Sequence, residues 1–374
     1  MNPFEYRAVG DIDAALAAIE SPPARGAPLA GKARFISGGT NLIDLMKERV
    51  MAPPLLVDIN RLPLRDITPT AAGGLSLGAL ARNEETAQHP LVRDRYPLLR
   101  AAILAGASPQ IRNMASNGGN LLQRTRCYYF YDAGVPCNKR EPGSGCPAAS
   151  GLARQHAILG ATRHCIATHP SDMCVALAAL DAVVQVRSAT GSRSIAFEDF
   201  HRLPGDRPDV DTTLADDELI VSIDLPPAGQ FSGHCTYLKI RERASYAFAL
   251  VSVAVALDLA DDGTVRAARL ALGGVAHKPW RNREAEALLT GRRAEAESYQ
   301  AAAAHVVADA QSWGGPALPD STAGNAYKIP MARRAIVRAL EMAAAGVLSN
   351  TGEDAPDEAA AVSDERGSPE GERP

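Results

Sequence analysis

The most informative segment of this 374-residue sequence reads Ser108-Pro-Gln-Ile-Arg-Asn-Met-Ala-Ser-Asn-Gly-Gly-Asn-Leu-Leu-Gln123. Its paired glycines, Gly118 and Gly119, are typical of a turn whose backbone approaches a ligand closely. A loop that contains Cys127, Cys137 and Cys146 follows directly. The segment therefore predicts two neighbouring sites, one for an organic cofactor and one for a metal.

The composition excludes several classes of protein. Hydrophobic residues make up 46% and charged residues 22% of the chain, the balance of a soluble globular protein. A net charge of −4 gives no reason to expect nucleic acid as a partner. No run approaches ~18 consecutive apolar residues, so we expect no membrane span. The first residues, 1–7, do not read as a signal peptide, and cysteines in such a chain are more often reduced or metal-bound than disulfide-linked.

Hydrophobic periodicity divides the sequence into strands and helices. The ranges 33–37 and 55–59 read as buried strands around a helix that contains Leu42, Leu45 and Met46, and this order implies parallel pairing. We expect further strands and helices, in chain order: a helix at 11–20, a strand at 74–79, a helix at 97–105, a strand at 156–167, a helix at 172–180, and strands at 182–187 and 219–225.

A domain boundary is expected at Pro226-Pro227. Beyond it, a turn at 261–264 joins two of three strands into an antiparallel sheet, which is followed by three helices. The predicted strands are 234–241, 250–259 and 266–272, and the predicted helices are 283–289, 295–310 and 331–345. From about Ser349 the sequence has almost no apolar residues, so we predict that 349–374 is a disordered tail.

The first glycine turn is Phe35-Ile36-Ser37-Gly38-Gly39-Thr40-Asn41-Leu42. A strand that ends in two glycines and passes at once into a helix exposes unpaired backbone N–H groups, which suit a pyrophosphate. The turn is neither a GxGxxG motif nor a P-loop. An ordinary tight turn without a ligand is the plainer interpretation of this segment taken alone.

The second glycine turn is Ser116-Asn117-Gly118-Gly119-Asn120. Two such turns, each flanked by Asn and by Ser or Thr, suggest two backbone walls around one long ligand. A dinucleotide fits that arrangement better than a mononucleotide does.

The cysteine loop has the composition of a metal site. Nine residues separate Cys127 from Cys137, and eight separate Cys137 from Cys146, wider gaps than those of a zinc ribbon or a ferredoxin motif. Proline and glycine keep the loop irregular. We expect its basic residues to offset an anionic cluster and to favour deprotonated thiols; they are Arg124, Arg126, Lys139 and Arg140.

A four-iron cluster needs a fourth ligand, and Cys165 at the end of the predicted strand 156–167 is our choice. Cys174 and Cys235 read as buried core thiols. Histidine could replace a cysteine at three positions, His156, His164 and His169. A zinc site, or unliganded surface thiols, remain open as alternatives for the loop.

Two charged residues, Asp172 and Lys239, occupy positions in the sequence that are consistent with a functional role. Asp172 starts a predicted helix, where an acid commonly serves the helix N-terminus, but it could also lie near a flavin ring. Lys239 lies in the middle of an apolar strand, where a charge needs a partner such as a flavin carbonyl unless it reaches solvent. We find no residue pattern typical of hydrolytic chemistry.

Together these segments resemble the FAD-binding subunit of the molybdenum hydroxylases, the xanthine dehydrogenase family. The resemblance covers roughly residues 3–345. It implies an α+β fold: a two-subdomain FAD-binding module of the vanillyl-alcohol oxidase (PCMH) type at 1–226, divided near 59/60, and a C-terminal domain of antiparallel sheet and helices at 232–345. Within the family, the cysteine loop at 124–165 resembles the periplasmic aldehyde oxidoreductase type, whose FAD subunit carries an additional [4Fe–4S] cluster.

The resemblance also assigns residues to cofactors. FAD would lie against the two glycine turns, 35–42 and 116–120, with Gly106 and Ser108 in the same binding set, and with Asp172, Ile220 and Lys239 beside its ring system. The cluster would be held by Cys127, Cys137, Cys146 and Cys165. Only six residues separate Asn120 from Cys127, at most ~25 Å of extended chain, so flavin and cluster should lie within electron-tunnelling reach.

The implied function is electron transfer within a heterotrimer. A large subunit with the molybdenum cofactor would oxidise an aldehyde to a carboxylic acid, a small subunit would hold two [2Fe–2S] clusters, and this chain would pass the electrons through FAD to an external acceptor. Co-export with a signal-bearing partner would make it periplasmic; a cytoplasmic location is the alternative. Other readings are a 4-hydroxybenzoyl-CoA reductase-like or xanthine dehydrogenase-like subunit, a self-sufficient flavin enzyme, and a non-catalytic assembly subunit with a zinc loop.

Overall fold

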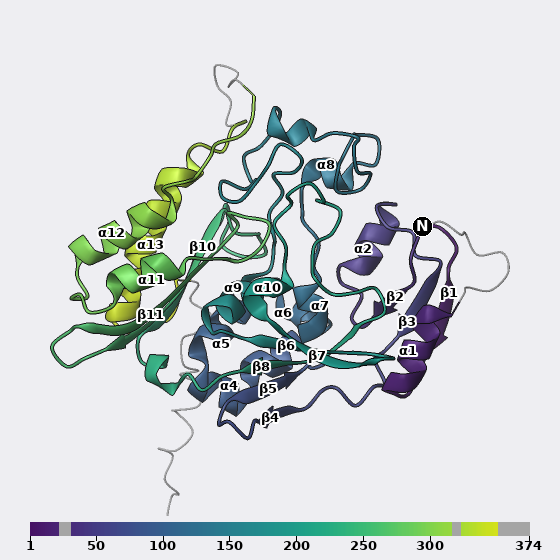
Figure 1. The fold of residues 1–374 in the computed structure, drawn as a ribbon, viewed down its shortest axis with the longest axis horizontal. Coiled ribbons are helices and arrows are strands. Elements are labelled where there is room, and N and C mark those ends of the chain that lie inside the picture. The colour runs from purple at the N-terminus through teal and green to yellow at the C-terminus, as the bar shows by residue number, and fades with distance from the viewer. Residues whose placement is uncertain (22–30, 316–322, 351–374) are drawn as a thin grey trace, which may run out of the picture.

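A computed structural model describes residues 1–21, 31–315 and 323–350 of the chain. It contains three sheets, and the cysteine loop lies apart from all three, at the top of the view in Figure 1. No helix among the described residues is long and apolar enough to cross a membrane.

The N-terminal sheet is parallel, as the strand–helix–strand pattern predicts. Its strands are β1 (Glu5–Ala8), β2 (Arg34–Ile36) and β3 (Leu55–Asp58), in the order β1-β3-β2. Asp11 caps helix α1 (Ile12–Glu20) by accepting a hydrogen bond from the Ala14 N–H at 2.7 Å. Helix α2 (Leu42–Lys47) begins directly after the Gly38-Gly39 turn and packs Leu45 and Met46 into the interior.

The second sheet is antiparallel and has five strands in the order β4-β5-β8-β6-β7. Helices lie beside it in Figure 1, and apolar side chains from most of them share one hydrophobic core with the sheet. The strands are β4 (Ile67–Pro69), β5 (Leu75–Gly78), β6 (Val183–Ser188), β7 (Gly191–Ala196) and β8 (Leu219–Leu225). The helices are α3 (Asn83–Gln88), α4 (Pro90–Arg95), α5 (Pro97–Leu104), α6 (Pro109–Arg112), α7 (Asn117–Leu121), α9 (Asp172–Ala179) and α10 (Phe197–Phe200).

The C-terminal sheet is covered on both faces. Along β10, Val253, Val255 and Leu257 belong to the core shared with the C-terminal helices, whereas Ala254 and Ala256 belong to the core shared with α5 and α9. This alternation follows from the two-residue period of a strand. The strands are β9 (Cys235–Ile240), β10 (Val251–Leu259), β11 (Val265–Gly273) and β12 (Trp280–Arg281), and the helices are α11 (Arg283–Leu289), α12 (Ala296–Val306) and α13 (Lys328–Ala344).

The predicted strand at 156–167 is wrong. That range is irregular apart from an isolated bridge between Thr162 and Cys165. Its apolar residues are buried, but Ile158 and Leu159 both donate their backbone N–H to the Val275 carbonyl, at 2.9 and 3.0 Å, instead of joining a ladder. An apolar run therefore marks burial here and not a strand. Most of the predicted tail lies outside the described residues; Ser349 and Asn350 lie beside β9.

Candidate functional site

A cavity of about 900 Å³ opens between the N-terminal sheet and the second sheet. Every residue of the first glycine turn, from Phe35 to Leu42, lines it, and so do Ser116, Gly118 and Gly119 of the second turn and Ile220 of β8. The two turns, more than seventy residues apart in the chain, thus face one space. A pocket of this size accommodates a large organic cofactor.

Gly38 brings the two turns into contact. A Cβ atom added there would lie 1.9 Å from the carbonyl oxygen of Met114, just ahead of the second turn. Gly39 adopts φ +71°, which a residue with a side chain seldom does. Both glycines are therefore required by local geometry, which explains why the strand ends in this pair.

The first turn presents unused hydrogen-bond donors to the cavity. Within the described residues, nothing accepts a hydrogen bond from the backbone N–H groups of Gly39, Thr40 and Asn41. The Asn41 side chain is fixed because its Oδ1 accepts from the Arg124 N–H at 2.9 Å, yet its buried Nδ2 has no partner in the described chain. Unsatisfied donors that face a cavity are suited to an anionic or carbonyl-rich ligand.

The second turn differs from a simple loop. Ser116 caps the short helix α7, with its Oγ accepting from the Gly119 N–H at 3.3 Å. Gly118 and Gly119 line the cavity, but Asn117 is fully buried and bonds to Thr86 and Gly78, away from it. Asn120 likewise does not line the cavity; it bonds to Asn83, Ser171 and Gln123. The asparagines thus fix the wall rather than face the space.

Two predicted residues lie behind this wall. Ser108 caps α6 through a 3.4 Å contact from the Ile111 N–H to its Oγ. The Gly106 carbonyl accepts from Arg112 at 3.1 Å, and a Cβ at Gly106 would lie 3.3 Å from an Asp172 oxygen. Neither residue lines the large cavity, so their placement beside FAD stays a prediction.

Asp172 and Lys239 bind each other. The Lys239 Nζ lies 2.8 Å from Asp172 Oδ2 and also donates to the Ala105 carbonyl at 2.8 Å, while the Tyr237 hydroxyl donates to Asp172 Oδ1 at 2.6 Å. The Lys239 side chain is 1% exposed, so it does not reach solvent. Its partner is thus a carboxylate of α9, and a flavin carbonyl is not needed to satisfy it. Asp172 lines a small cavity next to the large one.

Three histidines and an acid on the cavity wall escaped the sequence-based prediction of the flavin site. His169, His201, His277 and Asp211 come from separate loops, so nothing local marks them. Burial lowers the pKa of His201 to about 4 and puts the pKa values of His169 and His277 well below the usual range. These rings are therefore neutral. Burial would raise the pKa of Asp211, but Lys139 and Arg124, which both bond to it, hold it well below its ordinary value.

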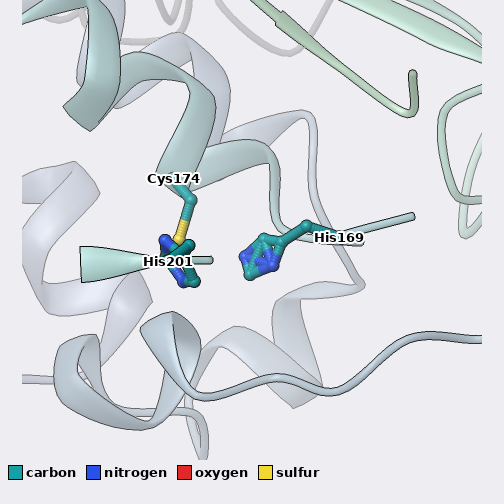
Figure 2. A group of neighbouring side chains, drawn as sticks. All are labelled: His169, Cys174 and His201. Atoms are coloured by element: carbon teal, nitrogen blue, oxygen red, sulfur yellow. The ribbon is translucent and has the colours of Figure 1, made fainter. Parts of the chain in front are cut away.

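Two of these rings converge on Cys174 of α9 (Figure 2). The ring centroids of His169 and His201 are 4.3 Å apart, and His201 Nε2 lies 2.8 Å from the Leu121 carbonyl oxygen. Burial raises the pKa of the Cys174 thiol to about 12. Cys174 and Cys235 are both buried, as their apolar surroundings predict.

The four predicted cluster ligands come together. Cys127, Cys137, Cys146 and Cys165 all line one small cavity, although they come from four parts of an irregular loop. Cys165 is 5% exposed and Cys137 9%. His164 also lines this cavity, and His156 Nε2 lies 3.1 Å from the Cys127 sulfur. Lys139 lines both this cavity and the large one.

The basic residues of the loop each have a partner of their own. Arg124 and Lys139 bond to Asp211, Arg126 bonds to Asp44, and Arg140 donates to backbone carbonyls. Burial raises the pKa of Cys127 to about 12 and that of Cys146 as well. It raises the pKa of Cys165 to about 11, although the charge of Lys139 acts in the opposite direction. Thiols in such a setting stay protonated unless a metal takes the place of the proton.

The spacing of the sulfur atoms bears on which metal they could hold. A tetrahedral zinc ion, with Zn–S bonds of ~2.3 Å, draws its sulfur ligands to about 3.8 Å from one another. In the described part of the chain, His169, Cys174 and His201 form the one group of three such side chains whose ligand atoms all lie within 4.8 Å. The loop cysteines form no such group, so no three of their sulfur atoms lie within 4.8 Å of one another.

The two sites are connected by shared walls. The small cavity beside Asp172 shares Thr125, Thr168 and His169 with the large cavity, and it shares Cys127 with the cysteine cavity. The small cavity thus shares lining residues with both of the other cavities.

Comparisons with known proteins identify the chain as a flavin-binding subunit. Residues 2–228 match the family described as "FAD binding domain in molybdopterin dehydrogenase", and residues 236–343 match "CO dehydrogenase flavoprotein C-terminal domain". The aldehyde oxidoreductase FAD-binding subunit of Escherichia coli is 47% identical over 92% of this chain and 99% of its own length. The glyceraldehyde dehydrogenase medium chain of Sulfolobus acidocaldarius is 29% identical over 70% of this chain and 74% of its own length.

Solved structures with a similar fold come from the same group of enzymes. A solved structure of carbon monoxide dehydrogenase from Hydrogenophaga pseudoflava superimposes with a TM-score of 0.67 and 27% identity, covering 92% of this chain and 99% of that one. The expected fold, an FAD-binding module followed by an antiparallel sheet with helices, is thereby confirmed. The chain belongs to the family of FAD-binding subunits of molybdenum-dependent oxidoreductases.

Proposed function

We propose that this chain is the electron-transfer subunit of a molybdenum-dependent aldehyde oxidoreductase, with FAD in the large cavity and a [4Fe–4S] cluster at Cys127, Cys137, Cys146 and Cys165. The observation that carries this proposal is the shared wall: Cys127 lines both the cysteine cavity and the small cavity, and the small cavity shares Thr125, Thr168 and His169 with the large one. A chain built only to hold FAD has no need of four cysteines around one small cavity, two of them buried.

The residues present fit FAD. The free N–H groups of Gly39, Thr40 and Asn41 would hold its pyrophosphate, and Gly118 and Gly119 would let the cofactor approach the second wall closely. The unpartnered Asn41 Nδ2 supplies a further donor. When bound, FAD accepts and releases electrons at the end of the chain of redox groups.

The cysteines fit an iron–sulfur cluster better than they fit zinc or no metal. The raised pKa values of Cys127 and Cys165 mean that these thiols are inert on their own. Their wide spacing argues against a single ion, which is the assembly-subunit alternative. Lys139, held by Asp211 and the Pro208 carbonyl, places a positive charge beside both cavities, where it offsets the negative charge of a cluster.

The proposed partners follow from the relatives. The 47% identity to an aldehyde oxidoreductase subunit favours an aldehyde as the substrate of the complex. A large subunit with the molybdenum cofactor would oxidise it, and a small subunit with two [2Fe–2S] clusters would deliver the electrons here for an external acceptor. We also propose that the complex is periplasmic through the leader of a partner; fractionation of cells with and without that leader tests this.

The experiment is to express the chain with the neighbouring subunits, purify the complex without oxygen, and add an aldehyde. We expect the three chains to copurify and the flavin absorption bands to bleach in the complex, but not in the isolated chain. Bleaching in the isolated chain would instead support a self-sufficient flavin enzyme. Bleaching by a purine, but not by any aldehyde, would support the xanthine dehydrogenase-like alternative. Reoxidation of the chemically reduced flavin by 4-hydroxybenzoyl-CoA would support the 4-hydroxybenzoyl-CoA reductase-like alternative.

A further inference from the structure

The His156 side chain lies between the two proposed redox sites. It is 2% exposed, and its Nε2 lies 3.1 Å from the Cys127 sulfur. The ring and Cys127 both line the small cavity that also contains Asp172 and His169. Among the described residues, His156 is the one histidine whose ring nitrogen lies within hydrogen-bonding distance of a sulfur atom of the cysteine loop.

We propose that His156 donates a hydrogen bond from Nε2 to the Cys127 sulfur and so sets the reduction potential of the cluster. This inference rests on the proposed cluster. A metal-bound thiolate carries no proton, so a hydrogen bond between the two atoms requires the proton to be on Nε2. His156 is therefore a positioning residue that acts through a ligand and does not bind iron itself.

The protein fixes the His156 backbone by hydrogen bonds and flanks its ring with two aromatic side chains. The His156 carbonyl accepts from the Lys328 Nζ at 2.9 Å and from the Asn325 Nδ2 at 3.2 Å, and both of these side chains are fully buried. The His156 N–H donates to the Ala153 carbonyl at 2.8 Å. The rings of Tyr128 and Tyr129 flank the imidazole, with centroids 6.2 and 6.4 Å away. A donor fixed in this way needs no reorganisation when a neighbouring sulfur changes charge.

The chemical consequence concerns the charge on sulfur. One electron added to a cluster increases the negative charge on its thiolates, and an N–H group aimed at one of them stabilises that added charge more strongly than the oxidised state. Hydrogen bonds to ligand sulfurs therefore raise the reduction potential. Burial strengthens the effect because the local dielectric is low.

The test is a redox titration of the assembled complex, followed by the electron paramagnetic resonance signal of the reduced cluster. His156→Phe keeps the ring volume but removes the donor, and we expect it to lower the midpoint potential of this cluster alone. His156→Gln keeps an N–H and should retain most of the wild-type potential. His305→Phe, on helix α12 away from the cysteine cavity, is the control and should leave the potential unchanged.

A second measurement uses the unaltered protein, in case the phenylalanine variant fails to assemble. With ¹⁵N-labelled histidine, pulsed resonance of the reduced cluster should show coupling to one histidine nitrogen. An unchanged potential in an iron-loaded His156→Phe complex, an equal shift in His305→Phe, or no nitrogen coupling in the wild type would each overturn the role of His156. A wild-type chain without iron would remove the proposed cluster and this inference together.

Discussion

The Lys239 ammonium lies 2.8 Å from the Asp172 carboxylate, with both side chains buried at the junction of α9 and β9. Tyr237 and the Ala105 carbonyl complete the hydrogen bonding of the pair. The ion pair therefore joins the FAD-binding part of the chain to the C-terminal sheet. Because Asp172 lines the small cavity, the ion pair also fixes the position of the Asp172 carboxylate on the wall of that cavity.

Replacing Lys239 with Met should destabilise the chain by about 3–5 kcal/mol, because Asp172 would be left buried without a countercharge. Adding Asp172→Asn to this variant should recover part of the loss, since the stranded charge is removed. Chemical denaturation measures both. Lys47→Met, at an exposed position, is the control and should change stability by no more than about 0.5 kcal/mol. An equally small effect at Lys239 would contradict the importance of the pair.

Gly38→Ala should abolish tight flavin binding. The new methyl group would collide with the Met114 carbonyl oxygen, because a Cβ atom built at Gly38 lies only 1.9 Å from that oxygen. The collision would push the two glycine turns apart. We expect the flavin content of the purified chain to fall at least about tenfold, the equivalent of about 1.4 kcal/mol. Gly229→Ala, at a site with open space around the added atom, should retain its flavin. Loss of flavin in both variants would show that the effect is not local.

Cys165→Ala should remove most of the iron, because the cluster would lose one of its four thiolates. Cys235→Ala provides a control of matched burial, since the two side chains are 5% and 4% exposed and only Cys165 lines the cysteine cavity. Iron analysis after anaerobic purification distinguishes them. Iron that is unchanged in Cys165→Ala would mean that the fourth ligand is another residue.

The buried Lys328 should make stability depend on pH. Burial lowers its pKa from 10.5 to about 7, so between these values the unfolded chain binds a proton that the folded chain does not. The free energy of unfolding should therefore rise with pH across this window, by up to about 1.4 kcal/mol per pH unit, relative to Lys328→Met, which does not titrate. Urea titrations of both proteins at about pH 7, 8 and 9 test this. A difference that is flat or falls with pH would contradict the lowered pKa.

Much of the fold follows from sequence patterns that reflect local physics. The parallel β2–α2–β3 unit and the antiparallel β9–β10–β11 sheet were both predictable, because hydrophobic period, glycine turns and the Asp-Gly hairpin act within a few residues. The error at 156–167 came from burial against the Val275 segment, a long-range contact that a local pattern does not report. The edge strands β1, β4, β7 and β12 also escaped prediction, because they have few buried apolar residues and so lack a strand pattern.

The site was predictable in its backbone and not in its side chains. Glycine pairs mark a close approach of chain and ligand, so the two walls could be found. The neutral histidines His201 and His277 come from distant loops, and no motif points to them. The partner of Lys239 was also hidden, because Asp172 lies on a helix and not on a neighbouring strand.

The most direct test of the proposed function is to count cofactors in the chain purified without oxygen. Flavin is measured after acid release, and iron and acid-labile sulfide are measured on the same sample. We expect one FAD per chain together with about four irons and four sulfides from a single cubane cluster. In Cys165→Ala we expect a loss of iron but not of flavin. One flavin per chain with zinc in place of iron, or with no metal, would contradict the proposed function.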